Sequence, residues 1–406
     1  MNGATLRRMS LIQELERTRD ETLKCFSLDQ RDLARTYGRA SGPSRMSFIT
    51  SPTARPCSSI PSVKCSVSLG RSITCVKSGW RWAVQPPDQS MMKSLILALC
   101  LVVAFGSLGA QTSSWQPSPG HRQIPIWPGA VPDAQPTSDS ESMATAPQPV
   151  AGRPWAYVRY VSRPTLTVYS PQENNTGAAI VVFPGGGYQI LAIDLEGSEI
   201  CDWLTSKGIT CVLLKYRVPR SGPSWDPGCK CNINPKPQTA LEDAQRTVGL
   251  VRLHAPEWHV DPRKIGVLGF SAGGHLVAAI STQFQRRLYA AVDAADQESC
   301  RPDFAVALYP GHLWIPESGQ FGFNPDIHVT RNTPPTFLLQ AETDSVDNVN
   351  QSLVYYIALK DAGVPTEMHL YADGGHAFGL RRTKDPITVW PQLVEKWLRT
   401  IGMISE

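Results

Sequence analysis

The chain has 406 residues, with 39 lysines and arginines against 35 acidic residues, a formal net charge of +4. The positive surplus belongs to residues 1–90, which carry 14 basic and 7 acidic residues, whereas residues 91–406 carry 25 and 28. No basic stripe falls on the rest of the chain, which argues against a nucleic-acid-binding protein. A hydrophobic fraction of 42% excludes disorder throughout.

A candidate secretion signal lies at residues 91–110. Met91, Met92 and Lys93 precede a short apolar run, and small residues follow it up to Ala110. This order is typical of a signal peptide, and the apolar run is short for a helix that spans a bilayer. A signal anchor or a buried core segment is the alternative. We expect cleavage near Ala110 and a secreted or periplasmic protein whose mature form has no membrane contact.

The signal divides the chain into segments. Because signal peptides belong at N-termini, we expect residues 1–90 to be a non-native leader from an early start assignment. If that leader were part of the protein, residues 91–110 would instead be a membrane anchor. Residues 111–152, rich in Pro, Ser, Thr and Gln, are predicted to be a poorly ordered lead-in. Residues 153–403 have the size and the regular pattern of one α/β catalytic domain.

The regular part begins with two β-rich runs. Trp155–Val161 and Thr165–Tyr169 bracket Arg163-Pro164 and predict a hairpin. The hydrophobic spacing then predicts, in chain order, strand 178–183, helix 194–207, strand 209–216, helix 238–254, strand 265–270, helix 272–284, strands 304–309 and 336–340, helix 346–362, strand 366–371 and helix 386–400.

Most of these strands are apolar throughout. Such strands indicate a mostly parallel sheet covered by helices on both faces, here with an antiparallel pair at one edge. Ligands of open parallel sheets bind beyond the carboxyl ends of the strands. We therefore expect chemistry in the loops that follow Phe183, Phe270, Gln340 and Tyr371.

Gly269-Phe270-Ser271-Ala272-Gly273-Gly274 connects a predicted strand to a predicted helix. The G-x-S-x-G pattern in this context is typical of a sharp turn that lifts a serine above the sheet. Side chains on either side of the turn would collide, which explains the glycines. We predict Ser271 as a nucleophile, with an ordinary glycine-rich turn as the alternative.

A serine nucleophile needs a general base, and in this architecture the chain order is serine, acid, histidine. Of 8 histidines, only His369 and His376 lie late enough in the chain. His369 falls within a predicted strand, whereas His376 lies in a glycine-rich loop just beyond it. We predict His376 as the base; a histidine in a surface turn is the alternative.

Three carboxylates compete for the role of the acid. Glu342, Asp344 and Asp347 follow the strand that ends near Ala341. Asp344 is at the crest of the turn, where a carboxylate can orient the imidazole. Asp347 is expected in the first helical turn, where a carboxylate commonly only complements the helix dipole. We predict Asp344, with Asp347 as its main rival.

The triple glycine after Phe183 predicts an oxyanion hole. Glycines allow the backbone to approach a substrate closely, and a tetrahedral intermediate needs backbone N–H donors. We expect the donors to be the amides of Ala272 and of Gly186 or Gly187. A phosphate-binding loop is the alternative, but no Lys-Ser or Lys-Thr follows.

Taken together, Ile180–Tyr188, Gly269–Gly274, Ala341–Val346 and Gly374-Gly375-His376 resemble the α/β-hydrolase superfamily. The chain is similar, more narrowly, to its secreted acetylxylan-esterase-like branch, which is related to feruloyl esterases and dienelactone hydrolases. Further segments that support this are residues 124–129, 192–197, 214–217 and 242–246.

Two positions depart from related patterns. Pro184 stands where hormone-sensitive-lipase-like relatives have histidine, which argues against that branch. Thr343 stands where the acid is often preceded by a second aspartate.

The resemblance implies a serine esterase that uses no metal or cofactor and has no large lid. It implies a small acyl group such as acetyl, on a small-molecule or oligosaccharide ester derived from plant polysaccharide. Trp314, Phe321 and Phe323 either line a sugar-binding rim or pack a long loop.

Two other functions stay open: a serine peptidase of the prolyl-oligopeptidase kind and a non-catalytic hydrolase-fold binding protein. Residues 111–152 are few for the peptidase's extra domain, and a binding protein would usually have lost the triad.

Five of the 10 cysteines lie before residue 111. Cys201 and Cys211 fall in apolar patterns and are expected to be buried free thiols. In an oxidising compartment, Cys229 or Cys231 can form a bridge with Cys300. The cysteines after residue 110 have no suitably spaced second pair of ligands, which argues against a zinc site.

Overall fold

The computed structural model describes residues 64–68, 72–77, 80–81, 114–134, 139–218, 225–226, 231–232, 238–316 and 321–405. The chain divides into two compact units, Met1–Phe105 and Gly106–Glu406. In the first unit, β1 (Lys64–Ser68), β2 (Ser72–Lys77) and β3 (Trp80–Arg81) form an antiparallel sheet. The predicted signal peptide lies outside the described residues. None of the described helices combines the length and the apolar character needed to cross a bilayer.

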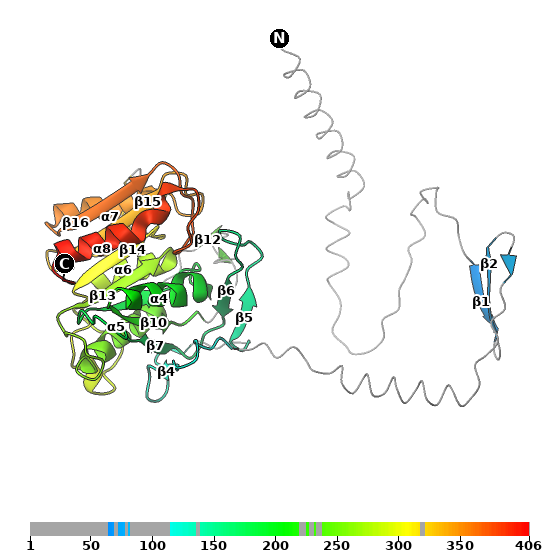
Figure 1. Ribbon diagram of the computed structural model, residues 1–406, viewed down its shortest axis with the longest axis horizontal. Coiled ribbons are helices and arrows are strands. Elements are labelled where there is room, and N and C mark those ends of the chain that lie inside the picture. Colours follow the sequence, from blue (N-terminus) through cyan, green and yellow to red (C-terminus); the bar gives the residue numbers. More distant parts are fainter. Residues whose placement is uncertain are drawn as a thin grey trace, which may run out of the picture. The chain divides into compact units, whose positions relative to one another are not determined.

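A sheet of 8 strands forms the centre of the second unit, in the order β16-β15-β14-β13-β8-β10-β7-β4 (Figure 1). Its parallel strands are β8 (Ala179–Phe183), β10 (Thr210–Lys215), β13 (Ile265–Phe270), β14 (Phe304–Leu308), β15 (Thr336–Ala341) and β16 (Thr366–Tyr371). Every residue of β8, β10, β13, β14 and β15 is buried, as expected for a sheet covered on both faces. β7 (Thr165–Tyr169) and β4 (Ile124–Pro125) add the predicted antiparallel edge.

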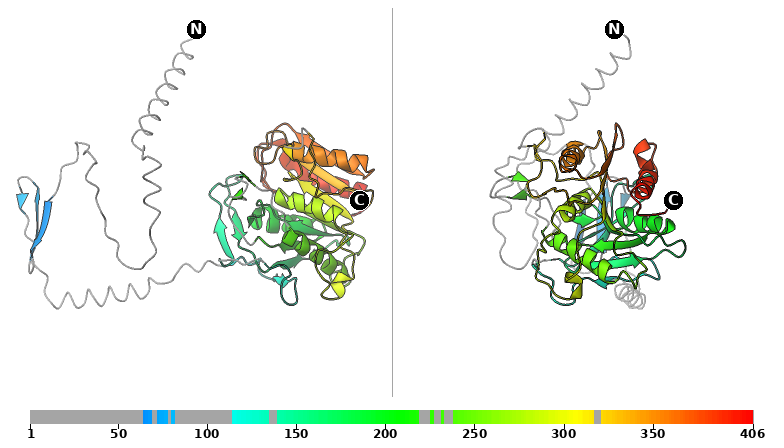
Figure 2. Two further views of the ribbon diagram at one scale, coloured as in Figure 1. Left: turned by 180° about the vertical axis from the view of Figure 1, so that it is seen from behind. Right: turned by 90° about the vertical axis from the view of Figure 1, so that its left-hand side faces the viewer.

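Helices cover both faces of this sheet (Figure 2). On one face, α4 and α8 meet through Trp203 and Trp390, whose ring centroids are 5.2 Å apart. α5, α6 and α7 cover the opposite face. The bounds are α4 (Glu199–Ser206), α5 (Gln238–Leu253), α6 (Ala272–Thr282), α7 (Asn350–Asp361) and α8 (Trp390–Thr400), with short turns η1 (Asp194–Ser198), η2 (Ala294–Asp296) and η4 (Pro386–Val389). The predicted α/β architecture is confirmed.

The predicted hairpin of Trp155–Val161 with Thr165–Tyr169 is wrong. β6 (Ala156–Arg159) pairs with β5 (Ser142–Thr145) and β9 (Ile190–Leu191) in a separate three-stranded sheet. β7 pairs instead with β10 and β4. Local alternation of polar and apolar residues identifies a strand but does not reveal which distant strand occupies each of its edges.

The prediction for Cys201 and Cys211 is also wrong, because the two residues form a disulfide between α4 and β10. Their apolar surroundings correctly place both side chains inside, but a pattern cannot show that a helix and a strand bring two sulfurs together. Cys300 is buried and free, and its thiol donates to the carbonyl of Phe284. This contradicts a bridge to Cys300 from Cys229, which lies outside the described residues, or from Cys231, whose side chain is not described.

A buried charge network joins the segment before β5 to α5. The Arg217 guanidinium donates to Asp243 at 2.9 and 3.0 Å and to Glu242 at 2.9 Å. The indole N–H of Trp127 also donates to Asp243, at 2.9 Å. Arg246 donates from its Nε to the carbonyl of Ile126 and pairs with Asp293 and Asp296. We call Trp127, Arg217, Glu242, Asp243 and Arg246 the Arg217–Asp243 network; it unites three of the segments on which the sequence resemblance rests.

Candidate active site

Ser271 lies at the turn between β13 and α6. Its backbone has φ 52° and ψ −119°, a strained conformation for a residue with a side chain. A Cβ on Gly269 would lie 2.2 Å from the carbonyl oxygen of Gly273, and one on Gly273 would lie 2.1 Å from that of Phe183. Both glycines are therefore required for the turn to form, as the motif predicted.

The structure brings Ser271, Asp344 and His376 together. His376 Nε2 lies 3.0 Å from Ser271 Oγ, and His376 Nδ1 lies 2.7 Å from Asp344 Oδ2. The backbone amides of Val346 and Asp347 each donate to Asp344 Oδ1 at 2.9 Å, which fixes the orientation of the carboxylate. The three side chains come from the loops after β13, β15 and β16, at the edge of the sheet where the sequence predicted chemistry.

Charges around His376 make it a stronger base. Burial lowers the pKa of His376, but the hydrogen bond and charge of Asp344 and the charges of Asp347 and Glu196 outweigh burial, so the pKa is raised. The ring also packs against Tyr309, with centroids 4.9 Å apart. The imidazole is thus held in one orientation and surrounded by negative charge.

The glycine loop after β8 lies against the same turn. A Cβ on Gly185 would be 3.0 Å from Ser271 Cβ and 2.8 Å from the carbonyl oxygen of Phe270. Among the described residues, the amides of Gly186, Gly187 and Ala272 donate to no other group. The loop that carries Gly186 and Gly187 therefore starts beside Ser271, and the N–H groups of these glycines and of Ala272 are available for a ligand.

Glu196 is a member of the site that the sequence analysis did not assign. Its carboxylate is buried, accepts a hydrogen bond from the Gly185 amide at 2.8 Å and accepts another from the Tyr309 hydroxyl at 2.9 Å. Burial raises the pKa of Glu196, while His376 and these two hydrogen bonds lower it. The only signal in the sequence was a pair of acidic residues, Asp194 and Glu196, that alternate with apolar residues in the run 192–197.

The prediction that Asp347 lies in the first turn of a helix is wrong. α7 begins at Asn350, so Asp347 belongs to the loop after β15. Its Oδ2 accepts a hydrogen bond from Ser271 Oγ at 3.3 Å and lies 3.7 Å from His376 Nε2. The prediction failed because the helical pattern was extended four residues toward Val346. Asp344, not Asp347, contacts His376 Nδ1; Asp347 lies on the nucleophile's side of the ring.

Comparisons with known proteins agree with this geometry. The chain is 31% identical over 228 residues to the acetylxylan esterase of Xylanibacter ruminicola, a match of 51% of this chain and 42% of that protein. It is 28% identical over 229 residues to the endo-1,4-beta-xylanase B of Butyrivibrio fibrisolvens, covering 52% and 34%. The chain thus spans less than half the length of these curated relatives.

A solved structure matches over nearly its whole length. The acetyl ester-xyloside bifunctional hydrolase from Caldicellulosiruptor lactoaceticus has 31% identity and a TM-score of 0.54, with 70% of this chain and 97% of that chain covered. The chain belongs to the acetylxylan-esterase-like branch of the α/β hydrolases. A sequence profile described as the prolyl oligopeptidase family matches residues 236–400 of this α/β hydrolase. The predicted fold class and family are confirmed, as is membership of a group of carboxylic ester hydrolases.

A second cluster of aromatic and imidazole side chains borders the serine of this α/β hydrolase. His275, in the first turn of α6, has Nδ1 2.8 Å from the Tyr188 hydroxyl. Burial and the nearby His312 lower the pKa of His275 to about 3, so its ring is neutral. The imidazole Nε2 of His275 has no partner among the described residues.

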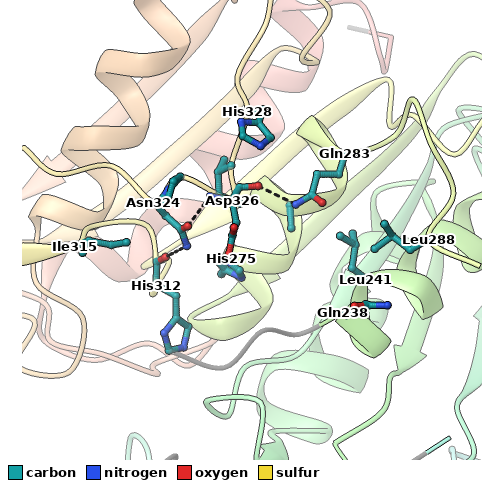
Figure 3. A pocket seen from close by; sticks show the side chains of 13 residues that line it. Gln238, Leu241, His275, Gln283, Leu288, His312, Ile315, Asn324, Asp326 and His328 are labelled. Carbon is teal, nitrogen blue, oxygen red and sulfur yellow. Dashed lines mark hydrogen bonds between the residues drawn. The ribbon is translucent and has the colours of Figure 1, made fainter. Parts of the chain in front are cut away.

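A pocket of about 470 Å³ opens beside His275 and His312 (Figure 3). Side chains of α5, α6, the loop after α6 and residues 312, 315 and 324–328 line it. Hydrogen bonds of Asn324 to the His312 carbonyl and of Gln283 to the Asp326 carbonyl fix its wall. Its lining mixes polar with apolar groups: Gln238, Leu241, His275, Ala279, Gln283, Leu288, His312, Ile315, Asn324, Pro325, Asp326, Ile327 and His328.

The three aromatic residues considered for a sugar-binding rim differ in their surroundings. Phe323 stacks on Tyr355 of α7 and forms a β-bridge with Trp314, whereas Phe321 is 56% exposed. Phe323 therefore packs the long loop onto the domain. Within the described ranges, no cluster of His, Cys, Asp and Glu has a geometry that could hold a metal ion.

Proposed function

We propose that this α/β hydrolase is a secreted serine esterase that removes small acyl groups, acetyl above all, from carbohydrate derived from plant polysaccharide. The observation that carries the proposal is the position of His376, hydrogen-bonded to Asp344 through Nδ1 and to Ser271 through Nε2. A serine hydroxyl becomes an effective nucleophile when a base takes its proton, and the carboxylate stabilises the imidazolium that results.

In the acylation step, Ser271 Oγ attacks the ester carbonyl while His376 Nε2 takes the hydroxyl proton. The amides of Ala272 and of the Gly186–Gly187 loop stabilise the oxyanion of the tetrahedral intermediate. His376 then gives its proton to the departing alcohol. A water molecule repeats the sequence on the acyl-enzyme and releases the carboxylic acid.

Two observations support a carbohydrate acetyl ester as the substrate. The relatives are named an acetylxylan esterase and an acetyl ester-xyloside hydrolase. The pocket beside His275, a residue four positions after Ser271, is not lined by Ser271 itself, but it has polar groups suited to hydroxyls and a size that fits a small ligand. Export rests on the sequence pattern of residues 91–110, with cleavage near Ala110.

The decisive test replaces the nucleophile. Ser271→Ala is expected to lower kcat for p-nitrophenyl acetate by roughly 10⁶-fold and to stop acetate release from acetylated xylan. Ser281→Ala on the same helix is the matched control, because Ser281 is buried but its hydroxyl contacts no described polar group. If Ser271→Ala left hydrolysis unchanged, the proposed mechanism would be wrong, and a non-catalytic role would take its place.

A peptidase is the second candidate, because the prolyl oligopeptidase family profile covers the three triad positions. Its acyl-enzyme chemistry would be the same, so the substrate decides. We expect hydrolysis of p-nitrophenyl acetate and no release of aniline from a prolyl dipeptide anilide. The reverse result would favour the peptidase.

A further inference from the structure

Asp347 places a second carboxylate at the nucleophile. Its Oδ2 lies 3.3 Å from Ser271 Oγ and 3.7 Å from His376 Nε2, and the side chain is only 14% exposed. A Cβ on Gly311 would lie 2.6 Å from Asp347 Oδ1, so the carboxylate occupies the space above this glycine. The imidazole of His376 therefore has a carboxylate beside each of its nitrogens.

The fold does not depend on this side chain for its hydrogen bonds. The backbone of Asp347 contributes locally, since its amide donates to Asp344 and its carbonyl accepts from Gln340. In the part of the chain that the structure describes, the carboxylate itself forms a hydrogen bond or ion pair only with Ser271 and His376. A buried carboxylate with such partners needs an explanation in the reaction rather than in the fold.

The geometry changes when Ser271 is acylated, because Oγ then has no hydrogen to donate. His376 Nε2 and Asp347 Oδ2 are left as two acceptors 3.7 Å apart beside the acyl carbon. A water molecule has two hydrogens and can donate one to each acceptor, which leaves an oxygen lone pair free to attack. We propose that Asp347 is a catalytic residue that binds and orients the hydrolytic water of the acyl-enzyme. This inference rests on the proposed function.

The step balances with water as the only co-reactant. The water oxygen forms a bond to the acyl carbon as one proton moves to His376 Nε2, while the other hydrogen stays on the oxygen and bonds to Asp347. The carbonyl electrons form the oxyanion. Its collapse breaks the bond from carbon to Ser271 Oγ, and His376 returns its proton to that oxygen. The product is the free carboxylic acid, and the serine is restored.

This arrangement distinguishes water from an alcohol. An alcohol has one hydroxyl hydrogen, which His376 must accept, so nothing remains to bond to Asp347. The carboxylate therefore favours hydrolysis over transfer of the acyl group to alcohols. Positioning of this kind is worth about 100-fold in rate.

The test compares Asp347→Val, which removes the acceptor at similar volume, with Asp347→Asn, which keeps one oxygen. With p-nitrophenyl acetate, we expect Asp347→Val to show a burst of one p-nitrophenol per active site and a kcat about 100-fold below wild type. The burst rate, which reports acylation, stays within a few-fold of wild type. Asp347→Asn is expected to recover part of the loss. In added methanol, the ratio of methyl acetate to acetate rises in Asp347→Val.

Equal losses in burst rate and steady-state rate, or an unchanged product ratio in methanol, would overturn the role in water binding. That result leaves the proposed function intact, provided that the wild type is active and Ser271→Ala is not. A wild type without Ser271-dependent ester hydrolysis would overturn both proposals. Circular dichroism melting of the variants separates a misfolded protein from a folded one that cannot deacylate.

Discussion

The molecule contains two clusters of buried charge that are built differently. In the Arg217–Asp243 network, each guanidinium faces carboxylates, with Arg217 paired to Glu242 and Asp243 at 2.9 Å. At the site, the carboxylates of Glu196, Asp344 and Asp347 surround one imidazole, and His376 is their shared cationic partner when protonated. The cations of the first cluster are guanidinium groups, which stay charged near neutral pH. The cation of the second cluster is the imidazolium of His376, which exists only while the ring carries a second proton.

This difference in charge means that the first cluster mainly affects the stability of the fold, whereas the second mainly affects the reactivity of His376. A buried ion pair whose partners are both present contributes little net stability, but loss of one partner leaves a costly unpaired charge. An excess of negative charge around an imidazole raises its proton affinity, as a general base requires. We therefore expect substitutions in the first cluster to affect unfolding and those in the second to affect rate and pH dependence.

Among substitutions of charged residues in the two clusters, the largest effect is expected for Asp344→Asn. Loss of the carboxylate at His376 Nδ1 is expected to lower kcat for p-nitrophenyl acetate by about 10⁴-fold, because the imidazolium is no longer stabilised. Asp373→Asn, an exposed position in the loop that carries His376, is the control and is expected to keep its activity. Full activity of Asp344→Asn would mean that another carboxylate orients the base.

Arg217→Met is expected to act on the other cluster. It leaves Asp243 and Glu242 buried without their cation and is expected to lower the free energy of unfolding by about 3–5 kcal/mol. Urea denaturation measures this change. Arg263→Met removes a guanidinium that is 87% exposed and paired with Asp261, and because water screens this pair, we expect little change in the free energy of unfolding. Similar losses for the two variants would contradict the contrast between buried and surface pairs.

Glu196→Gln tests whether charge near His376 sets the pH dependence. The negative charge of Glu196 favours imidazolium, so its removal lowers the pKa of His376. The neutral base then persists to lower pH, and the acid limb of the kcat/KM profile moves to lower pH. We also expect a rate loss of about 10-fold. The glutamine amide has one oxygen, so it can accept a hydrogen bond from only one of the two donors, the Gly185 amide and the Tyr309 hydroxyl, that bond to Glu196.

The matched control is Tyr309→Phe, which removes one of those donors and leaves the carboxyl group of Glu196 in place. It is expected to lower the rate without the same movement of the acid limb. If the pH profile of Glu196→Gln coincided with that of wild type, Glu196 would act through hydrogen bonds alone.

The smallest effect is expected for Trp127→Phe. Loss of the indole N–H that donates to buried Asp243 is expected to lower the free energy of unfolding by about 1–2 kcal/mol, with activity unchanged. Trp155→Phe provides the comparison, since its indole N–H donates to the Gln148 carbonyl at the surface. Its expected effect is within about 0.5 kcal/mol. Calorimetric melting of both variants would reveal any reversal of this order.

Local patterns in the sequence were sufficient to predict the sheet and the positions of Ser271, Asp344 and His376. The reason is that strand, turn and helix signals fix which end of each strand carries a loop, and parallel strands bring those loops together. The patterns failed where a partner is distant. They could not pair β6 with β9, bring Cys201 to Cys211, or direct Glu196 toward Gly185 and Tyr309. The start of α7 was placed four residues too early, and this hid the contact of Asp347 with Ser271.

The disulfide between Cys201 and Cys211 has a consequence for where the chain matures. Bonds of this kind form and persist in oxidising compartments and are rare where glutathione keeps thiols reduced. The oxidation state of these two sulfurs, which join α4 to β10, therefore indicates the redox environment in which the domain folded. Mass spectrometry of the purified protein can determine this oxidation state independently of residues 91–110. A protein produced in a reducing cytosol and one produced by export are expected to differ there by two hydrogens.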